Sequence, residues 1–335
     1  MNSPPARGDN PPPRVTVLTG YLGAGKTTLV NHLLSADHGY RIAVIVNEAG
    51  DIGIDGDLVV SSDEEVIEMA NGCVCCTLSV RQDLTATLKK LLERPDSPRY
   101  FLIEASGLAD PVPLTQALFV DGLADQLVLD GVITMVDSQH IEHHLDRFDS
   151  NPADSRAADQ ILCADRIVLN KTDLVGTSDC DRIEGRIRTL NSTAPLIRTR
   201  YARVDPGLLL GIGAFDPARQ AVESGRFGIE SEPADPTLQA TSLEVFDELD
   251  RTRLLAWLQA LVDDRAEDIH RIKGILALAG ETQPIVLQGV RSVFELYPGG
   301  SWSEGRSSRL VVIGRDLDEE MLREGMAGCR AEQTH

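Results

Sequence analysis

One glycine-rich segment near the start of the chain has the composition of a phosphate-binding loop. Residues 20–27 read Gly-Tyr-Leu-Gly-Ala-Gly-Lys-Thr and fit the pattern G-x-x-x-x-G-K-[ST]. Glycines let backbone N–H groups turn inward around phosphate oxygens, and a following helix N-terminus adds partial positive charge. We expect Lys26 to reach the β- and γ-phosphate oxygens and the Thr27 hydroxyl to bind Mg²⁺. The expected nucleotide-binding residues of this segment are Gly20, Gly23, Ala24, Gly25, Lys26, Thr27 and Thr28.

A second polar motif, Asn170-Lys171-Thr172-Asp173, follows an apolar run at 166–169. The Asp173 carboxylate can accept hydrogen bonds from the N1–H and 2-amino groups of guanine, and adenine offers neither. We expect Asn170 to bond the other edge of the base and the Lys171 stem to cover its face. The alternative is a polar turn that caps a helix, with Asp173 merely at the surface. Combined with the phosphate loop, the motif predicts GTP and GDP as ligands and argues against ATP.

An acidic residue ends another apolar run, in the order Ile103-Glu104-Ala105-Ser106-Gly107. Glu104 is expected to hold Mg²⁺ directly or through water, and the Gly107 N–H to sense the γ-phosphate. The alternative is an ordinary acid at the end of a strand. Ser106 is not a hydrolase nucleophile, because the G-x-S-x-G elbow is absent. No Gln or Arg stands out as the group that orients the attacking water, so the catalytic candidates are Lys26, Thr27, Glu104 and Gly107.

Three cysteines, Cys73, Cys75 and Cys76, crowd into four positions. Converging thiolates favour Zn²⁺, and also Cu(I) or iron–sulfur clusters. Zinc takes four ligands, so we name Glu48 and Asp51 as carboxylates that would complete the set. Redox-active thiols and buried inert cysteines remain alternatives. The remaining cysteines are scattered, and we interpret them as structural: Cys163, Cys180 and Cys329.

A histidine group, His140, His143 and His144, resembles a metal-binding patch. On a helix, His140 and His144 would share a face. The favoured interpretation is the polar start of a surface helix, and a secondary metal site stays open as the alternative.

Length, charge and composition limit the classes of function. The chain has 335 residues, which suggests about two domains. Its formal net charge of −20 repels phosphate backbones, which argues against a nucleic-acid partner. No apolar run approaches the ~20 residues of a membrane span, and the proline-rich N-terminus has no apolar h-region. Six cysteines are too few for a disulfide scaffold. We therefore expect a cytoplasmic protein with no membrane partner.

Short apolar runs alternate with stretches of helical spacing over the first two thirds of the chain. This alternation predicts an α/β domain with a parallel sheet and helices on both faces, as in P-loop NTPases. A proline-rich break then suggests a linker before a small α+β domain. The expected strands are 15–19, 42–46, 66–70, 100–103, 131–136 and 166–169, then 242–246, 275–278, 284–290 and 310–313. The expected division is a disordered tail at 1–13, a GTPase domain at 14–205, a linker at 206–238 and a C-terminal domain at 239–335.

Taken together, the motifs resemble the CobW-type P-loop GTPases, relatives of the metallochaperones UreG and HypB. The segments that carry the resemblance are 19–28, 47–51, 71–76, 104–111 and 170–173, with 270–274, 288–290, Trp302 and 310–315 towards the C-terminus. The resemblance implies a GTPase domain, a CobW C-terminal domain, and GTP hydrolysis coupled to transition-metal delivery. The metal is zinc in many members and cobalt for cobalamin in one branch. Two departures occur: Ala49 stands where Phe is frequent, and Val46 where some members carry a zinc-ligating Glu.

We therefore expect a GTP-hydrolysing metallochaperone that binds Zn²⁺ and delivers it to a client metalloprotein. The γ-phosphate and Mg²⁺ are expected to order segment 47–57 and the cysteine segment together, so that hydrolysis lowers metal affinity. Alternatives are a cobalt chaperone, a non-catalytic GTP-binding zinc buffer or sensor, and an ATP-dependent kinase or redox protein. The client and the oligomeric state, monomer or homodimer, stay open.

Overall fold

The computed structural model describes most of the chain. The described residues are 12–46, 65–68, 78–118, 122–123, 126–150, 156–191, 193–214, 238–265, 268–290, 293–298, 302 and 305–332. The expected N-terminal tail up to residue 11, Glu48, Asp51 and the three clustered cysteines lie outside them, as does most of the expected linker.

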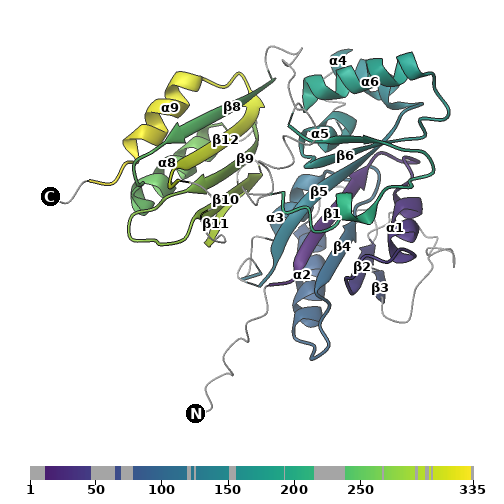
Figure 1. Cartoon of the computed structure of the whole chain (residues 1–335), viewed down its shortest axis with the longest axis horizontal. Coiled ribbons are helices and arrows are strands. Elements are labelled where there is room, and N and C mark those ends of the chain that lie inside the picture. Colours follow the sequence, from purple (N-terminus) through teal and green to yellow (C-terminus); the bar gives the residue numbers. More distant parts are fainter. Residues whose placement is uncertain are drawn as a thin grey trace.

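The first sheet has seven parallel strands, as the alternation of apolar and helical segments predicted (Figure 1). Their order is β3-β2-β4-β1-β5-β6-β7. The expected apolar runs became strands because both faces of a parallel sheet are covered, so nearly every strand residue is buried. The strands are β1 (Arg14–Gly20), β2 (Ile42–Val46), β3 (Glu65–Glu68), β4 (Tyr100–Glu104), β5 (Val128–Asp137), β6 (Arg166–Asn170) and β7 (Leu196–Arg198).

Helices lie on both faces of this sheet. Alternate strand residues point to opposite faces. One set, including Leu18 and Leu102, packs with Leu29 and Leu33 of α1 (Lys26–Leu34). The other set packs against the remaining helices. These are α2 (Leu78–Leu92), α3 (Pro111–Ala117), α4 (Ile141–Ser150), α5 (Arg156–Leu162) and α6 (Thr177–Leu190).

The carboxyl ends of three neighbouring strands are in register, and β1 runs two residues past them. Glu68 of β3 lies beside Val46 of β2, which lies beside Glu104 of β4, which lies beside Leu18 of β1. In an open α/β sheet, ligands bind in the crevice outside this edge. The carboxyl-terminal edge of these four strands is therefore where a ligand is expected.

A buried carboxylate at the opposite edge fixes a later segment to the sheet. Asp130 of β5 accepts hydrogen bonds from the Arg14 guanidinium, the Tyr100 hydroxyl and the N–H groups of Ile212 and Gly213. The Asp130 side chain has no exposed surface and is surrounded by these donors. As a result, residues 206–214, which the proline content assigns to the linker, pack against the first sheet.

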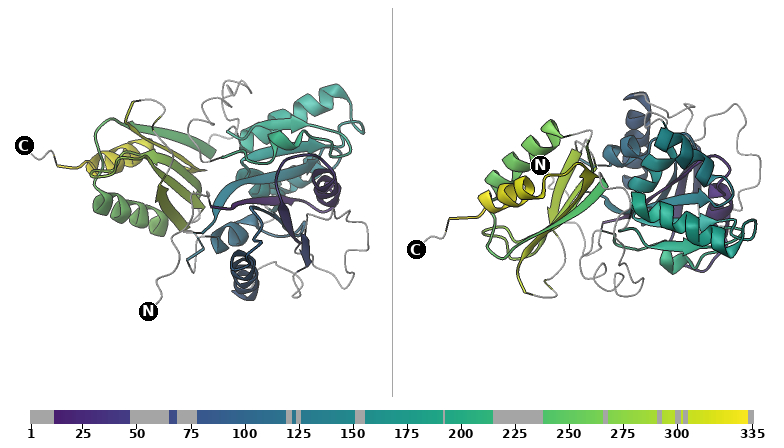
Figure 2. Two further views of the ribbon diagram at one scale, coloured as in Figure 1. Left: turned by 60° about the horizontal axis from the view of Figure 1, so that its bottom comes forward. Right: turned by 90° about the horizontal axis from the view of Figure 1, so that it is seen from above.

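The second sheet has five antiparallel strands in the order β11-β10-β9-β12-β8. Figure 2 shows α8 (Arg251–Asp264) and α9 (Glu319–Gly328) on the face turned away from the first sheet. Asp250 and Asp318 cap these helices by accepting from the third following N–H. This is the expected small α+β domain. Its strands are β8 (Leu238–Val245), β9 (Ile269–Leu276), β10 (Ile285–Val290), β11 (Val293–Pro298) and β12 (Ser308–Arg315).

None of the helices in the described ranges is both long enough and apolar enough to span a bilayer.

Candidate functional site

The expected phosphate loop joins β1 to α1, and its glycines have the backbone that a phosphate loop requires. Gly20, Gly23 and Gly25 have φ values of 139°, 76° and 102°. A Cβ on Gly20 would lie 2.2 Å from the Met135 carbonyl oxygen, and one on Gly25 would lie 2.6 Å from Asn170 Nδ2. Any side chain at these two positions would both strain the backbone and clash, so the loop needs glycine there.

The lysine of the loop is already folded over it. Lys26 is the first residue of α1, and its ammonium group donates to the Gly20 carbonyl at 2.9 Å. Only 8% of the residue is exposed. The charge therefore lies inside the turn of the loop, which also holds buried Ala24, while Thr28 lies exposed in the first turn of α1. A phosphate bound in the loop would replace Gly20 as the partner of this ammonium group.

Two oxygen-bearing side chains converge beside the loop. The Thr27 hydroxyl donates to Glu104 Oε1 at 3.3 Å, and Glu104 ends β4 with only 6% of its surface exposed. A hydroxyl and a carboxylate are the ligand types that Mg²⁺ prefers next to phosphate oxygens. These two residues fit a magnesium ion bound with the nucleotide.

Gly107 lies directly against the phosphate loop. A Cβ on this residue would approach the Leu22 backbone nitrogen to 2.7 Å. The loop after β4 and the phosphate loop are therefore in contact at this position, which suits a backbone N–H that reads the γ-phosphate.

Adding one methyl group at Gly107 is expected to disturb hydrolysis more than binding. In Gly107→Ala the loops must separate, so we expect GTP hydrolysis to slow by at least about tenfold, since misplacing a contact by 1 Å has effects of this size or larger. GDP affinity should stay within about threefold, because GDP has no γ-phosphate. Single-turnover phosphate release and GDP titration measure the two effects. Equal losses of GTP and GDP affinity would contradict the proposed role of Gly107.

Asn170 connects two loops around the expected base site. It ends β6, and its amide donates to the Ala24 carbonyl at 3.0 Å and accepts from the Ala202 N–H at 2.9 Å. Asn170 was predicted to bond the base itself. In the structure it ties the phosphate loop to the segment after β7, so its two hydrogen bonds hold these segments together at the expected base site.

Lys171 has an unusual backbone conformation, and its side chain forms an ion pair. Its φ is 61°, and its ammonium group lies 2.7 Å from Asp137 Oδ2 at the end of β5. Burial raises the pKa of Asp137, but hydrogen bonds from Lys171 and His140 outweigh it and leave the pKa below its ordinary value. Asp137 therefore stays ionised at neutral pH and keeps the Lys171 stem beside the base site.

Asp173 lies exposed in a cleft that the motifs did not fully predict. The cleft brings residues of the segment after β6 together with residues of and after β7. Tyr201, 68% exposed, and Ala202 both have positive φ values there. No motif marks this segment, because its role depends on β7, a strand of three residues that was not predicted. The lining residues are Thr172, Asp173, Arg198, Thr199, Arg200, Tyr201 and Arg203.

Exchanging the carboxylate for an amide should change which base is bound. In Asp173→Asn, the side chain no longer accepts from both the N1–H and the 2-amino group of guanine. Two charge-assisted hydrogen bonds contribute about 3 kcal/mol together, so GTP affinity should fall about 100-fold. An amide donor matches the 2-oxo group of xanthine, so XTP should compete better than GTP. Competition of a fluorescent nucleotide with GTP, XTP and ATP measures this, and an unchanged order would exclude Asp173 from the base site.

The histidine group does not form a metal site among the described residues. The His140 ring contacts Asp137 at 3.0 Å, and the His144 ring packs on Tyr21 of the phosphate loop with centroids 4.0 Å apart. Across the ranges that the structure describes, no three His, Cys, Asp or Glu side chains are grouped so as to hold a metal. His140 and His144 therefore lie against Asp137 and Tyr21 beside the expected nucleotide site, and the cysteine ligands remain a prediction from the sequence.

The fold and the site define a P-loop nucleotide-binding protein. Its sequence matches the profile of the CobW/HypB/UreG nucleotide-binding domain over residues 14–198. It also matches the cobalamin synthesis protein cobW C-terminal domain over residues 238–330. The two matches cover most of the chain, which therefore belongs to the CobW/HypB/UreG family, as the resemblance indicated.

Relatives with similar sequences extend over nearly the whole chain. The zinc chaperone YjiA of Escherichia coli (strain K12) is 32% identical and aligns over 95% of this chain and 99% of its own. The zinc chaperone CobW of a Sinorhizobium species is 33% identical over 92% and 94%. The crystal structure of Zn(II)-bound YjiA GTPase superposes with a TM-score of 0.65 at 29% identity, covering 96% of this chain and all of that one.

Proposed function

We propose that this chain is a GTPase that works as a zinc metallochaperone and delivers Zn²⁺ to a client metalloprotein. The observation that carries the proposal is the common edge of β3, β2, β4 and β1. The phosphate loop and Glu104 lie at that edge, and Cys73 follows β3 in the sequence. Names of relatives support the same reading, including the zinc-regulated GTPase metalloprotein activator 1 of Saccharomyces cerevisiae, 30% identical.

The nucleotide chemistry is assigned to groups that converge on the phosphate loop. Lys26 binds the β- and γ-phosphates, and the backbone N–H groups of 20–28 cradle them. Thr27 and Glu104 would hold Mg²⁺, which neutralises charge that develops on the phosphates. The Gly107 N–H reads the γ-phosphate. Asp173 selects guanine, with Asn170 and Lys171 fixing the walls of the base site.

The metal cargo is assigned to the three clustered thiolates. Cys73, Cys75 and Cys76 supply soft ligands, and Glu48 or Asp51 completes a four-coordinate set for Zn²⁺. Thiolate sites also accept Co²⁺, so metal content under reducing conditions decides between the two. Glu48 and Asp51 follow β2, and the cysteines follow β3, so the γ-phosphate can order both segments. Loss of that phosphate then lowers metal affinity and frees the ion for the client.

The proposed setting follows from the thiols and from the two sheets. Free thiols persist in the cytoplasm, where reducing conditions are maintained, so we place the chaperone there. We assign nucleotide and metal handling to residues 14–205, and propose that residues 239–335 contribute to contact with the client. A monomer and a homodimer are both compatible with this scheme.

Steady-state hydrolysis of GTP distinguishes a chaperone from a passive zinc buffer. We expect steady-state phosphate release from GTP, slow in the isolated protein because no water-orienting Gln or Arg was identified, and no comparable release from ATP. The rate of phosphate release should change when Zn²⁺ is added. Binding of GTP and Zn²⁺ with no phosphate release above the uncatalysed rate would identify a buffer or sensor and reject the chaperone cycle.

A further inference from the structure

Side chains of helix α5 donate hydrogen bonds to the loop that contains Gly107. The Gly107 and Ala109 carbonyls accept from the Gln160 amide at 3.3 and 3.1 Å, and the carbonyl of Leu108 between them accepts from the Arg156 guanidinium. Arg156 and Gln160 are four residues apart, so they share one face of α5. Gln160 is only 1% exposed. Three consecutive carbonyls after the strand that bears Glu104 thus depend on one helix for their position.

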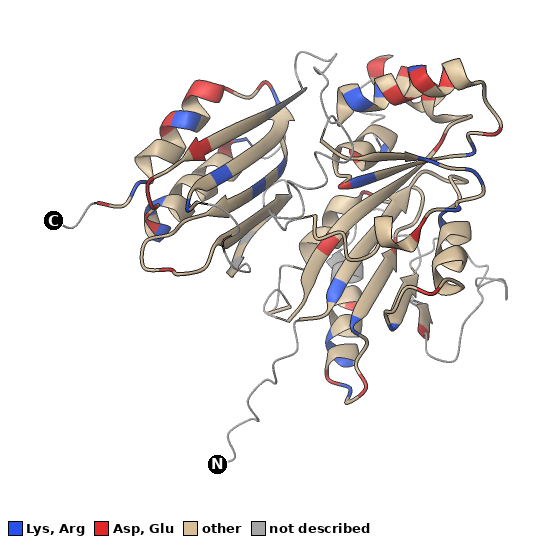
Figure 3. Cartoon of the chain, in the orientation of Figure 1, with Lys and Arg blue, Asp and Glu red and all other residues tan. Residues whose placement is uncertain are grey.

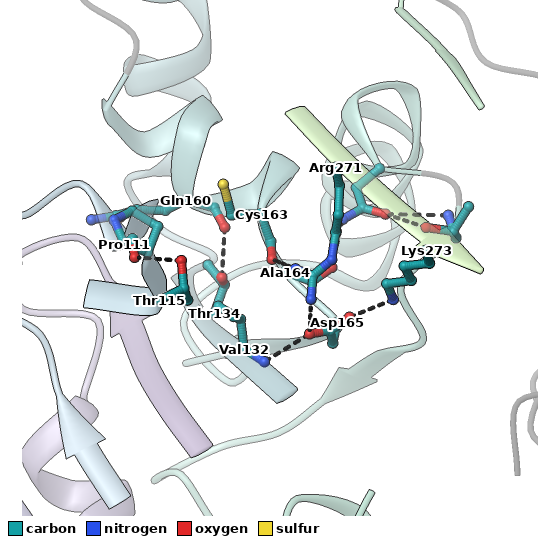
Figure 4. A network of polar contacts seen from close by, with 12 residues as sticks. Pro111, Thr115, Val132, Thr134, Gln160, Cys163, Ala164, Asp165, Arg271 and Lys273 are labelled. Atoms are coloured by element: carbon teal, nitrogen blue, oxygen red, sulfur yellow. Dashed lines mark hydrogen bonds and ion pairs between the residues drawn. The ribbon is translucent and has the colours of Figure 1, made fainter. Parts of the chain in front are cut away.

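The other end of α5 is held by the second sheet (Figure 4). Arg271 of β9 donates to the Cys163 carbonyl just after α5 and to Asp165 Oδ2 at 2.6 Å. Lys273, two residues further along β9, donates to Asp165 Oδ1. Asp165 Oδ2 also accepts from the Val132 N–H at 2.8 Å, which anchors the carboxylate to β5. One carboxylate therefore joins both domains.

This contact between the domains is shielded from water. The side chains of Asp165 and Arg271 are 0% and 1% exposed, and that of Lys273 is 17% exposed. Burial lowers the pKa of Lys273, and the Asp165 charge opposes the effect. Figure 3 shows Lys and Arg positions, in blue, along the strands of the second sheet. Charges in such a low-dielectric position interact strongly, and small displacements change their energy.

Two further contacts dock the same face of the second sheet. The Arg315 guanidinium of β12 lies 5.1 Å from the centre of the Phe148 ring of α4. Val286 of β10 is buried in the apolar cluster that includes Leu114 of α3. The docking surface therefore rests on the helices that follow the loops of the nucleotide site.

We infer that α5 connects the phosphate-reading loop to the docking of the second sheet, with Gln160 as a positioning residue for Gly107. The inference rests on the proposed role of Gly107. A γ-phosphate that fixes residues 107–109 also fixes α5 through Arg156 and Gln160, and so stabilises the contact of Asp165 with Arg271 and Lys273. By linkage, an intact contact at Asp165 must favour the GTP-bound state by the same factor.

The test compares nucleotide affinities of the full chain with the distant contact removed. For Arg271→Met, we expect affinity for a non-hydrolysable GTP analogue to fall at least about fivefold, the lower end of usual coupling, with GDP affinity unchanged. Gln160→Met should give the same selective loss. The double variant should lose no more than the larger single effect, because both substitutions break one connection. Arg323→Met and Gln259→Met, which alter exposed side chains of α9 and α8, are the matched controls.

Thermal unfolding identifies any variant that fails to fold. In that case Arg156→Met replaces Gln160→Met, since Arg156 is exposed, and Lys273→Met replaces Arg271→Met. Equal losses for the GTP analogue and GDP, no loss in either, or additive losses in the double variant would overturn the inference. If the unsubstituted chain hydrolyses GTP and binds zinc while the variants show any of these results, the inference alone has failed. If the unsubstituted chain neither hydrolyses GTP nor binds zinc, the proposed function has failed.

Discussion

In Lys26→Met, GTP hydrolysis is expected to be slower by about 1000-fold. The ammonium group lies buried inside the phosphate loop, 2.9 Å from the Gly20 carbonyl. From there it can exchange its hydrogen bond with Gly20 for hydrogen bonds to the phosphate oxygens. Removing a preorganised donor of this kind costs about 100- to 1000-fold in rate, and a full charge lies at the upper end. Single-turnover phosphate release at saturating GTP measures the effect.

The control for this prediction is Lys90→Met in the last turn of α2, which removes a lysine from an exposed surface. Its rate should match that of the unsubstituted chain. Hydrolysis by Lys26→Met within tenfold of the unsubstituted rate would mean that the phosphates bind elsewhere.

Replacing all three clustered cysteines with serine should lower zinc affinity by at least about 100-fold. Serine hydroxyls do not ionise near neutral pH, so Zn²⁺ loses its thiolate ligands, and thiolate sites in small zinc domains contribute on the order of 10 kcal/mol or more. GTP hydrolysis in the absence of metal should remain, because the phosphate loop, Thr27 and Glu104 are unchanged. Competition with a chromogenic zinc chelator, with Mg²⁺ and the GTP analogue present, measures the affinity.

Cys329→Ser is the matched control for the cysteine prediction. Cys329 is only 2% exposed, and burial raises the pKa of its thiol to about 11, so this thiol is a poor zinc ligand. It donates to the Gly325 carbonyl, and a serine hydroxyl can do the same. Zinc capture should therefore be unaffected. If the triple variant captured zinc as well as this control, the clustered cysteines would not be the cargo site.

The sequence predicted the first sheet well because parallel strands in this fold are apolar throughout. Ile42–Val46 matches its strand residue for residue, and the runs before Glu104 and Asn170 end one residue later than expected. Helices without a strong apolar stripe were harder to place. α5 is seven residues long, and β7 has only three, so neither carries enough periodicity to stand out.

The phosphate side of the nucleotide site was predictable, because its residues are adjacent in sequence. The base side was only partly so. Asp173 belongs to a motif, but Tyr201 and Ala202 join the site through an Asn170 contact across 32 positions. Asp137, which fixes Lys171, likewise lies far from it in sequence. Such contacts depend on the order of strands in the sheet, which local patterns do not specify.

The contact between the domains could not be predicted from the sequence either. His270-Arg271-Ile272-Lys273-Gly274 was noted as part of the resemblance, with no partner assigned. The structure pairs Arg271 and Lys273 with Asp165, more than a hundred positions earlier. A single acidic residue just before β6 carries no pattern that would mark it as the partner.

The measurement that tests the account most directly is zinc affinity of the full reduced chain with Mg²⁺ and a GTP analogue, compared with Mg²⁺ and GDP. We expect tighter binding with the analogue by at least about fivefold, within the usual range of coupling between two sites. Zinc should raise affinity for the analogue relative to GDP by the same factor. Equal zinc affinities in the two nucleotide states would contradict the claim that the terminal phosphate controls zinc affinity.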